Sequence, residues 1–285
     1  MRYLFTFMCV FALGLMGCSE TTGTGGSGGS DLCEGVMCED DSNECTENVC
    51  NPADGTCGVA VENGTACSSG ACLDATCTSL VMVGGIVAFG GAPPAEGSRI
   101  TVSVDGTSLS TTTSVSGSFF FDVFPGDWFF VTSKEDMVWG GIQLVSVPST
   151  GQRDLQLSVG ADADIVAIEE ECVVEIDDAR GIVSLYFVPT CGEGGEAATF
   201  SVPHGGAVTE DADGNCVVSE MLLAGGGAEF GGEIDYLNVD LTEELIVTPI
   251  APEGCECVIE PAESVQLVRA SFHTSGVDVR CTPVP

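Results

Sequence analysis

The chain has 285 residues and a formal net charge of −36 at pH 7, from 43 acidic against 7 basic side chains. So negative a surface repels phosphate backbones, which excludes nucleic acid as a partner, and it attracts divalent cations and basic surfaces. A simpler explanation than a specific role in ion binding is that the negative charge keeps the protein soluble, or that the protein tolerates a salty medium in which ions screen its self-repulsion.

The first residues predict export. One positive charge, Arg2, precedes an uncharged and mostly apolar run from Tyr3 to Leu15. This run is shorter than the ~20 apolar residues that a membrane-spanning helix needs. We therefore interpret residues 1–17 as a secretory signal peptide and not as a membrane span.

A cysteine follows directly, in the order Leu15, Met16, Gly17, Cys18. The four residues resemble the bacterial lipobox, in which cleavage before the cysteine makes it the lipidated N-terminus. The resemblance implies a lipid on Cys18, and several acyl chains would hold the protein stably at a membrane. Because Ser19 is not an aspartate, we expect the outer membrane or the cell surface. The alternative is an ordinary secretory signal in which Cys18 is incidental.

Residues 18–30 are predicted to be a tether. From Thr21 to Ser30 the chain contains only Thr, Gly and Ser. Such a composition has no apolar surface to bury, so the segment is expected to behave as a flexible linker. It would lift the folded part of the protein off the membrane.

Fourteen cysteines lie beyond the lipobox, in a group of eight and a group of six. They are Cys33, Cys38, Cys45, Cys50, Cys57, Cys67, Cys72, Cys77, then Cys172, Cys191, Cys216, Cys255, Cys257 and Cys281. Both groups are even, and an exported chain reaches a compartment in which disulfides persist. We therefore predict disulfide bonds and leave their pairing open. Free or metal-bound thiols are the less favoured alternative.

Residues 31–79 are predicted to form a small disulfide-rich module. They contain few large apolar side chains, so cross-links must supply the stability that a core cannot. Dense turn signals predict two or three small hairpins. The order of cysteines and acidic residues from Cys38 to Cys57 resembles the cysteine-rich repeat of myxobacterial cell-surface proteins. That resemblance implies a surface module without specifying its ligand.

Two acidic loops could coordinate calcium through side-chain oxygens. The candidate ligands are Asp40, Asp41 and Asn43 in the module, and Asp211, Asp213 and Asn215 further along. Carboxylate and amide oxygens suit calcium, but the second loop lacks the downstream glutamate of an EF-hand loop. Solvated acidic residues and an ordinary turn are the alternatives. No other cofactor is expected.

Residues 80–160 are predicted to form a β-sandwich. Apolar residues alternate with polar ones along 99–105 and again along 153–159, which is the period of a half-buried strand. Short strands separated by turns at this spacing indicate a sandwich or a barrel.

This segment also resembles a known family. A Gly-x-aromatic run at 117–121, the Pro125-Gly126 turn and an aromatic run at 127–130 are similar to the carboxypeptidase regulatory-like domain. The resemblance implies a transthyretin-like β-sandwich that spaces, stiffens or binds carbohydrate-like surfaces without catalysis.

The aromatic residues of the segment are expected to be mostly core. Phe119, Phe121, Trp128 and Phe130 could form a sugar-stacking platform, but alternating aromatics in so small a sandwich more often face inward. Trp139, beside two glycines, is the better candidate for an exposed contact.

Residues 161–285 are predicted to form a second β-sandwich of an unrecognised family. No apolar period of 3.6 residues is long enough to predict a helix. The strand-like runs are 172–176, 181–188, 197–202, 216–223, 234–241, 245–250 and 264–272. The expected fold class is therefore all-β, with a small disulfide-rich module followed by two β-sandwich domains.

The sequence predicts no active site. A hydrolase needs a nucleophile, a base and an orienting group. The chain has two histidines, His204 and His273, and neither a Gly-x-Ser-x-Gly nor a His-Glu-x-x-His pattern. We interpret both histidines as ordinary surface or turn residues. A catalytic pair of carboxylates is not excluded by composition.

These observations favour a non-catalytic lipoprotein of the cell envelope, with a structural or adhesive role. Its expected partners are the membrane, through the lipid, and a surface polysaccharide or an envelope protein. The alternatives are a carbohydrate-active hydrolase hosted by residues 161–285 and a subunit of an envelope assembly.

Overall fold

The computed structural model describes residues 32–89, 99–135, 137–159, 162–188, 195–223, 232–240, 244–260 and 265–284. The predicted signal peptide, Cys18 and the linker lie outside these ranges. Strands dominate the described residues, so the predicted all-β fold class is confirmed. None of the described helical structure is both long and apolar enough to span a membrane.

The N-terminal module consists of two small sheets. Its strands are β1 (Thr46–Cys50), β2 (Cys57–Ala60), β3 (Ala66–Cys67), β4 (Gly70–Leu73) and β5 (Thr76–Thr78). β1 and β2 form an antiparallel hairpin, and β3, β4 and β5 form a three-stranded antiparallel sheet. Small hairpins are therefore present, as the turn signals predicted.

Disulfides take the place of a core in this module. They join Cys33 to Cys50, Cys38 to Cys57, Cys45 to Cys72, and Cys67 to Cys77. Between residues 32 and 80, only Cys45, Ala71 and Cys72 are buried. The Cys45–Cys72 bond links the hairpin to the three-stranded sheet and forms the centre of the module.

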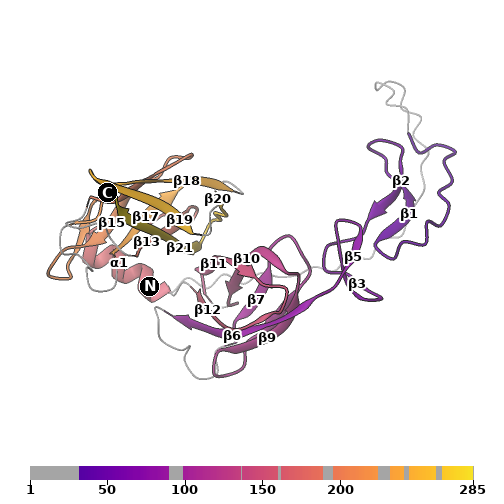
Figure 1. Cartoon of the computed structure of the whole chain (residues 1–285), viewed down its shortest axis with the longest axis horizontal. Coiled ribbons are helices and arrows are strands. Elements are labelled where there is room, and N and C mark those ends of the chain that lie inside the picture. Colours follow the sequence, from indigo (N-terminus) through magenta and orange to yellow (C-terminus); the bar gives the residue numbers. More distant parts are fainter. Residues whose placement is uncertain are drawn as a thin grey trace, which may run out of the picture.

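The module continues directly into the body of the protein (Figure 1). Ser79 and Leu80 alone separate β5 from the next strand. A 2.7 Å hydrogen bond from Ser108 N to Asn63 O gives a second attachment. Gly64 has a φ of +95°, and a Cβ there would lie 2.7 Å from Ser108 Oγ. Glycine is therefore required for this close approach.

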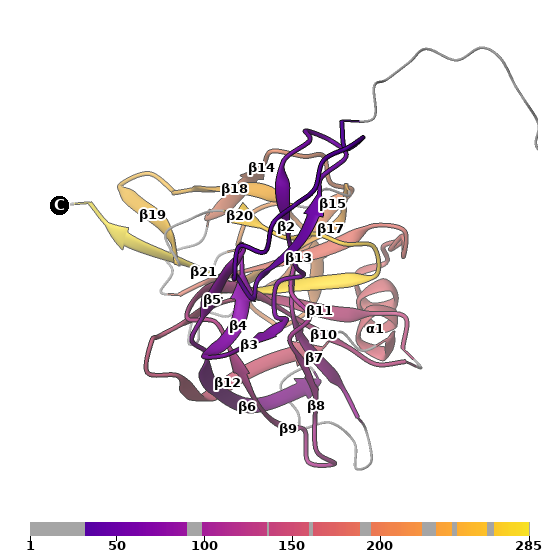
Figure 2. The same cartoon turned by 90° about the vertical axis from the view of Figure 1, so that its right-hand side faces the viewer.

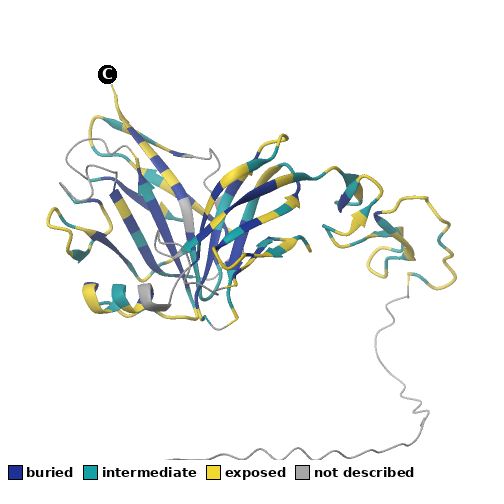
Figure 3. Cartoon of the chain, turned by 90° about the horizontal axis from the view of Figure 1, so that it is seen from below, coloured by how far each residue is buried: buried dark blue, intermediate teal, exposed yellow. Residues whose placement is uncertain are grey.

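The first sandwich packs two sheets face to face. One contains β6 (Val81–Phe89), β9 (Ser118–Val123) and β12 (Gln152–Val159), in the order β12-β6-β9. The other contains β7 (Thr101–Val104), β8 (Ser110–Thr112), β10 (Gly126–Ser133) and β11 (Gly140–Val147). Side chains alternate between the two faces of each strand, and Figure 3 shows the resulting bands of buried and exposed residues.

The aromatic residues of this sandwich behave as predicted, with one exception. Phe119 and Phe130 are buried in the core, and Phe121 and Trp128 pack against it from partly buried positions. Trp139 was the better candidate for an exposed contact, but it is only 5% exposed. That prediction is wrong because Trp139 packs into an apolar cluster with residues of the second sandwich.

The second sandwich contains the remaining strands. They are β13 (Gly181–Phe187), β14 (Ala197–Phe200), β15 (Gly206–Glu210), β16 (Cys216–Val218), β17 (Gly232–Val239), β18 (Leu245–Ile250), β19 (Cys255–Glu260), β20 (Val265–Gln266) and β21 (Phe272–Pro283). A core that includes Leu185, Ile234 and Val247 fills the space between β13 and β17 on one side and β14 and β18 on the other.

Strand β21 joins the two sandwiches into one sheet. It pairs in parallel with β11 of the first sandwich and with β13 of the second, and antiparallel with β19. The resulting ten-stranded sheet has the path β16-β15-β17-β13-β21-β11-β10-β7-β8, with β19 off this path on β21 (Figure 2). An ion pair between Arg269 and Asp105 also connects the two halves. The sheet is thus continuous across the boundary that the sequence placed at residues 160 and 161.

One helix was not predicted. α1 (Asp162–Cys172) ends at the first residue of the predicted strand 172–176, and the rest of that run forms no strand. Ile165, Ile168 and Cys172 give it a short apolar stripe, which packs on the sheet beside Trp139. The predicted strand is wrong because Cys172 ends the helix and residues 173–176 form a turn and irregular chain, while the short apolar stripe was too brief to predict the helix itself.

Disulfides also reinforce the second sandwich. Cys172 at the end of α1 is bonded to Cys216 on β16, and Cys257 on β19 is bonded to Cys281 on β21. Cys255 is disulfide-bonded as well, whereas Cys191 lies outside the described residues. Helix α1 and strand β21 are therefore both covalently fastened to their neighbours.

Candidate functional site

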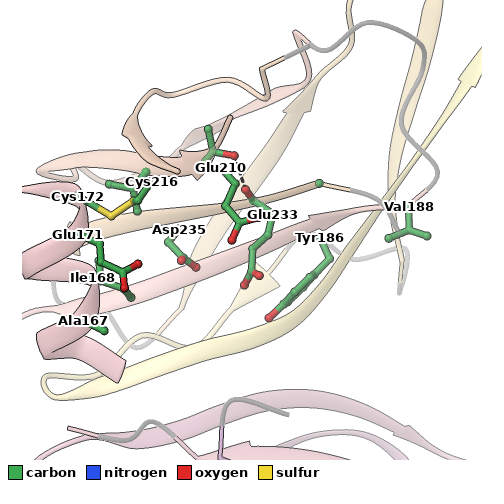
Figure 4. A pocket seen from close by; sticks show the side chains of 13 residues that line it. Ala167, Ile168, Glu171, Cys172, Tyr186, Val188, Glu210, Cys216, Glu233 and Asp235 are labelled. Carbon is green, nitrogen blue, oxygen red and sulfur yellow. Dashed lines mark hydrogen bonds between the residues drawn. A yellow bond between two sulfur atoms is a disulfide. The ribbon is translucent and has the colours of Figure 1, made fainter. Parts of the chain in front are cut away.

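A cavity of about 470 Å³ lies where α1 crosses one face of the ten-stranded sheet (Figure 4). Ile168 of α1 and the Cys172–Cys216 disulfide supply part of its lining. Its carboxylates come from three elements and are Glu171 of α1, Glu210 of β15, and Glu233 and Asp235 of β17. The cavity is therefore acidic, with an apolar wall.

Strand periodicity explains why these acidic side chains meet. Glu233 and Asp235 are two residues apart on β17, so they share a face, whereas the buried Ile234 between them points into the core. The register of β17 with β13 places Asp235 opposite Ser184 and Glu233 opposite Tyr186. The polar residues thus form two adjacent cross-strand pairs.

A hydrogen-bonded row crosses three strands at this point. Ser184 Oγ of β13 contacts both Asp235 Oδ1 of β17 and His273 Nε2 of β21. The single hydroxyl proton goes to the carboxylate, so the imidazole N–H donates to the serine oxygen. His273 Nε2 lies 3.9 Å from Asp235 Oδ1, and the two side chains are 22% and 18% exposed. The interpretation of His273 as a surface or turn residue is therefore wrong.

The protonation equilibria of this cluster are displaced by burial. Burial raises the pKa of Asp235 to about 6, and the hydrogen bond from Ser184 opposes this rise. Burial, and then the charge of Asp235, raise the pKa of Glu233 to about 7. Burial, and then the charge of Glu233, also raise the pKa of the Tyr186 hydroxyl. The two carboxylates therefore change protonation state in the mildly acidic to neutral range.

The geometry does not make Ser184 a nucleophile. In a Ser-His-Asp triad the histidine lies between the other two and takes the proton of an accessible serine. Here the serine lies in the middle and donates to the carboxylate, and Ser184 is completely buried. The row instead satisfies polar groups that the fold encloses.

Asp235→Asn should reduce the pH dependence of stability. Since the folded-state pKa of about 6 exceeds the ordinary aspartate pKa of 3.8, the native protein binds more protons between these values, and stability falls as the pH rises through them. Asparagine can still accept the Ser184 hydrogen bond but carries no charge. The free energy of unfolding of the variant minus that of the wild type should therefore be larger at pH 7 than at pH 4, by on the order of 2 kcal/mol.

Urea unfolding of both proteins from pH 4 to pH 8 measures this difference. Asp213→Asn, which removes an exposed carboxylate from the β15–β16 loop, is the matched control and should keep the wild-type slope. An Asp235→Asn profile parallel to that of the wild type would contradict the role given to this carboxyl group.

The first acidic loop is internally hydrogen-bonded. Asp40 Oδ1 accepts from Ser42 N at 2.8 Å, and Asp41 accepts from Asn43 N at 2.9 Å and from the Thr46 hydroxyl at 2.8 Å. The hydrogen bonds from Asn43 and Thr46 lower the pKa of Asp41. These contacts explain the conformation of the loop without a cation, and calcium binding here stays a prediction.

The second acidic loop forms a hairpin turn. Asp211 Oδ1 accepts from Asp213 N and Asn215 N, both at 2.9 Å, and the Asn215 amide contacts both carboxylate oxygens. These hydrogen bonds lower the pKa of Asp211. The structure therefore brings the predicted trio together around one aspartate. Calcium binding at this loop also stays a prediction.

Across the described ranges, one group of three side chains is close enough to share a metal ion, and it consists of Cys45, Cys67 and Cys72. These sulfurs belong to the Cys45–Cys72 and Cys67–Cys77 disulfides, so they are not thiolate ligands. Their proximity reflects the stacking of two disulfides at the centre of the module.

The other histidine has a structural role in a turn. His204 Nδ1 accepts from Gly206 N at 3.2 Å, and its ring lies 5.1 Å from that of Tyr236 and 5.5 Å from that of Phe200. The prediction of a turn histidine holds for this residue.

Sequence reasoning did not single out Glu233, Asp235 or Ser184. The signal was the alternation of acidic with apolar residues over 232–239, which marks a strand with one polar face. Their pairing with His273 could not be foreseen, because it depends on β21 lying beside β13.

Comparison with known proteins yields weak likenesses to solved structures. No family model matches the chain, and no curated protein matches it. Among solved structures, the Bacillus anthracis TIE protein is 14% identical with a TM-score of 0.22, over 70% of this chain and 34% of that one. The chain thus spans about a third of the TIE protein.

Two further neighbours match over their whole length. The major pilin of Streptococcus pyogenes is 10% identical with a TM-score of 0.23, over 74% of this chain and 100% of that one. A DUF3823 family protein from Parabacteroides merdae is 11% identical with a TM-score of 0.24, over 73% of this chain and 100% of that one. Likenesses of this size carry no argument about function, which must come from the molecule itself.

Proposed function

We propose that this protein is a non-catalytic component of the cell envelope with a structural or adhesive role. The observation that supports it most directly is the continuous cross-linked framework. A module fastened by four disulfides runs into a body whose main sheet passes through both sandwiches. Such a framework holds a binding surface in a fixed position relative to the N-terminal module, which the linker joins to the point of attachment.

The point of attachment in this proposal is a lipid on Cys18, at the outer membrane or cell surface. The lipobox resemblance and the Gly/Ser/Thr linker support it. The many disulfides fit the same location, because they persist in oxidising compartments outside the cytoplasm. The ligand in this proposal is a surface polysaccharide or an envelope protein.

Replacing Cys18 with Ala should release the protein from the membrane fraction, because the acyl chains would have no attachment point. Fractionation of cells that express the full chain, followed by immunoblotting, measures the distribution. Ser19→Ala, at the adjacent position, is the control and should stay membrane-bound. Equal membrane retention of the Cys18→Ala protein would remove the lipid anchor from the proposal.

The adhesive role is tested with the full chain, purified in detergent and immobilised. It is exposed to isolated envelope and to extracellular polysaccharide, first in calcium and then in chelator. Retention of a polymer or protein supports adhesion, and loss of retention in chelator assigns part of it to the acidic loops. No retention under either condition would contradict an adhesive role.

One observation favours a hydrolase as the second candidate. Glu233, with a pKa of about 7, lies beside Asp235 at the acidic cavity, and paired carboxyl groups of unequal acidity serve glycoside hydrolysis. Release of reducing sugar from the bound polymer, lost in Glu233→Gln, would establish this candidate. Retention of intact polymer would support the binding role.

A further inference from the structure

The outer face of the β12-β6-β9 sheet carries an exposed apolar patch. Met82 and Ile86 of β6 are 47% and 39% exposed, and Phe120 of β9 is 59% exposed. The sheet lies on the side of the first sandwich away from β7 and β10 (Figure 1). On the inner face of the same strands, Val83 and Phe119 are buried. The patch is therefore separate from the core.

A glycine makes room for the aromatic ring of this patch. Gly84, between Met82 and Ile86 on β6, pairs with Phe120 on β9. A Cβ at residue 84 would lie 2.1 Å from Phe120 Cδ1 and 2.4 Å from Cε1. The ring therefore lies across β6, in the space that any larger residue would fill. Its position is fixed by the backbone, while more than half of its surface stays exposed.

Polar side chains flank Ile86 and Met82, the two apolar neighbours of the ring on β6. Gln156 of β12 pairs with Ile86, and Ser118 of β9 pairs with the same residue from the other side. Asp122 of β9 pairs with Met82, whose sulfur lies 3.9 Å from the Arg153 guanidinium. Gln156, Asp122 and Arg153 are exposed. They supply donors and acceptors at the edge of an apolar surface about 13 Å long.

This combination fits a sugar chain better than a protein. A pyranose presents C–H groups on its faces, which stack on the electron-rich face of an aromatic ring, and hydroxyls at its edge, which need hydrogen-bond partners. One partner of a stable protein interface buries ~800 Å², more than three partly exposed side chains supply. The net charge of −36 repels acidic polymers, so a neutral polysaccharide is the matching ligand.

We propose that Phe120, seated on Gly84, is the platform on which the protein binds a neutral surface polysaccharide. This rests on the proposed adhesive function and assigns it a site. Met82 and Ile86 extend the stacking surface along the strand. Gln156 and Ser118 hydrogen-bond the hydroxyls at its edge.

The test uses the full chain in detergent and three neutral glucans (cellulose, amylose and a soluble β-1,3-glucan), with polygalacturonate as the acidic comparison. Cosedimentation and calorimetry measure binding. Phe120→Ala should weaken binding to the preferred glucan by at least about tenfold, since it removes the stacking ring. Phe120→Trp should retain binding, and Gly84→Val should lose it by displacing the ring.

Val218→Ala is the matched control, because Val218 is 66% exposed on the distant strand β16. It should bind as the wild type does, and thermal unfolding checks that every variant is folded. Glucan binding that Phe120→Ala leaves unchanged would overturn the platform and leave the adhesive function standing at another site.

Three other results also decide between the platform and its alternatives. Retention of an envelope protein with no glucan bound would overturn the platform while keeping adhesion. Binding to polygalacturonate alone would contradict a neutral ligand. If neither envelope material nor any glucan is retained, the proposed function itself fails, so the failure of the site and the failure of the function are distinguishable.

Discussion

Removing the Cys45–Cys72 disulfide is expected to unfold the N-terminal module while the two sandwiches stay folded. This bond closes the longest loop in the module, with a sequence separation of 27, and its loss should cost about 3.5 kcal/mol in chain entropy. The module has no apolar core to compensate, since its buried residues are the two cysteines and Ala71. The double variant Cys45→Ala/Cys72→Ala should therefore lose both of its small sheets.

Hydrogen exchange measured by mass spectrometry locates the effect. Peptides from 32–80 should exchange within the shortest labelling time, whereas those from β10 and β17 should stay protected. The control is Cys257→Ala/Cys281→Ala, which removes a disulfide where the β19–β21 ladder and a core remain. Protection of the module equal to that of the wild type would show that its hairpins are stable without this bond.

The second large effect is expected from Val277→Asp, which should destabilise both sandwiches together. Val277 is fully buried on β21, and an unpaired carboxylate there should cost more than about 4 kcal/mol. Because β21 lies between β11 and β13, loosening it opens the sheet at its centre. With Trp139 replaced by Phe in every protein compared, Trp128 fluorescence in the first sandwich should therefore report the damage, although Val277 belongs to the second.

The matched control for this prediction is Thr282→Asp, an exposed position near the end of the same strand, which should change stability by less than about 0.5 kcal/mol. Urea unfolding followed by tryptophan fluorescence compares the two variants. A normal Trp128 transition in Val277→Asp would mean that the first sandwich folds independently of β21.

Local pattern was sufficient to predict most strands. Alternation along 99–105 and 153–159 predicted strands close to their observed bounds, because strand periodicity depends on neighbours in the sequence. Helix α1 escaped prediction because its stability comes from docking and from the bond to Cys216, which no local pattern reveals. The burial of Trp139 was missed for the same reason, since residues of the other sandwich bury it.

Among the candidate sites too, those formed by local sequence were predictable and those formed by tertiary contacts were not. The acidic loops were visible as residue patterns, and the structure does gather them locally. The Ser184 row and the Phe120 platform depend on which strands are neighbours and in which register. The alignment of two residues across a sheet cannot be predicted from a single sequence, because register is set by the whole fold.

The position of β21 has a consequence for how the chain acquires its structure. β11 ends at Val147, yet its parallel partner begins only at Phe272. Until that strand is in place, the forming sheet has an unpaired apolar margin at β11 and another at β13, which invites association with other chains. The shared sheet can therefore close only after most of the chain has been synthesised, and a half-built intermediate with two open edges precedes it.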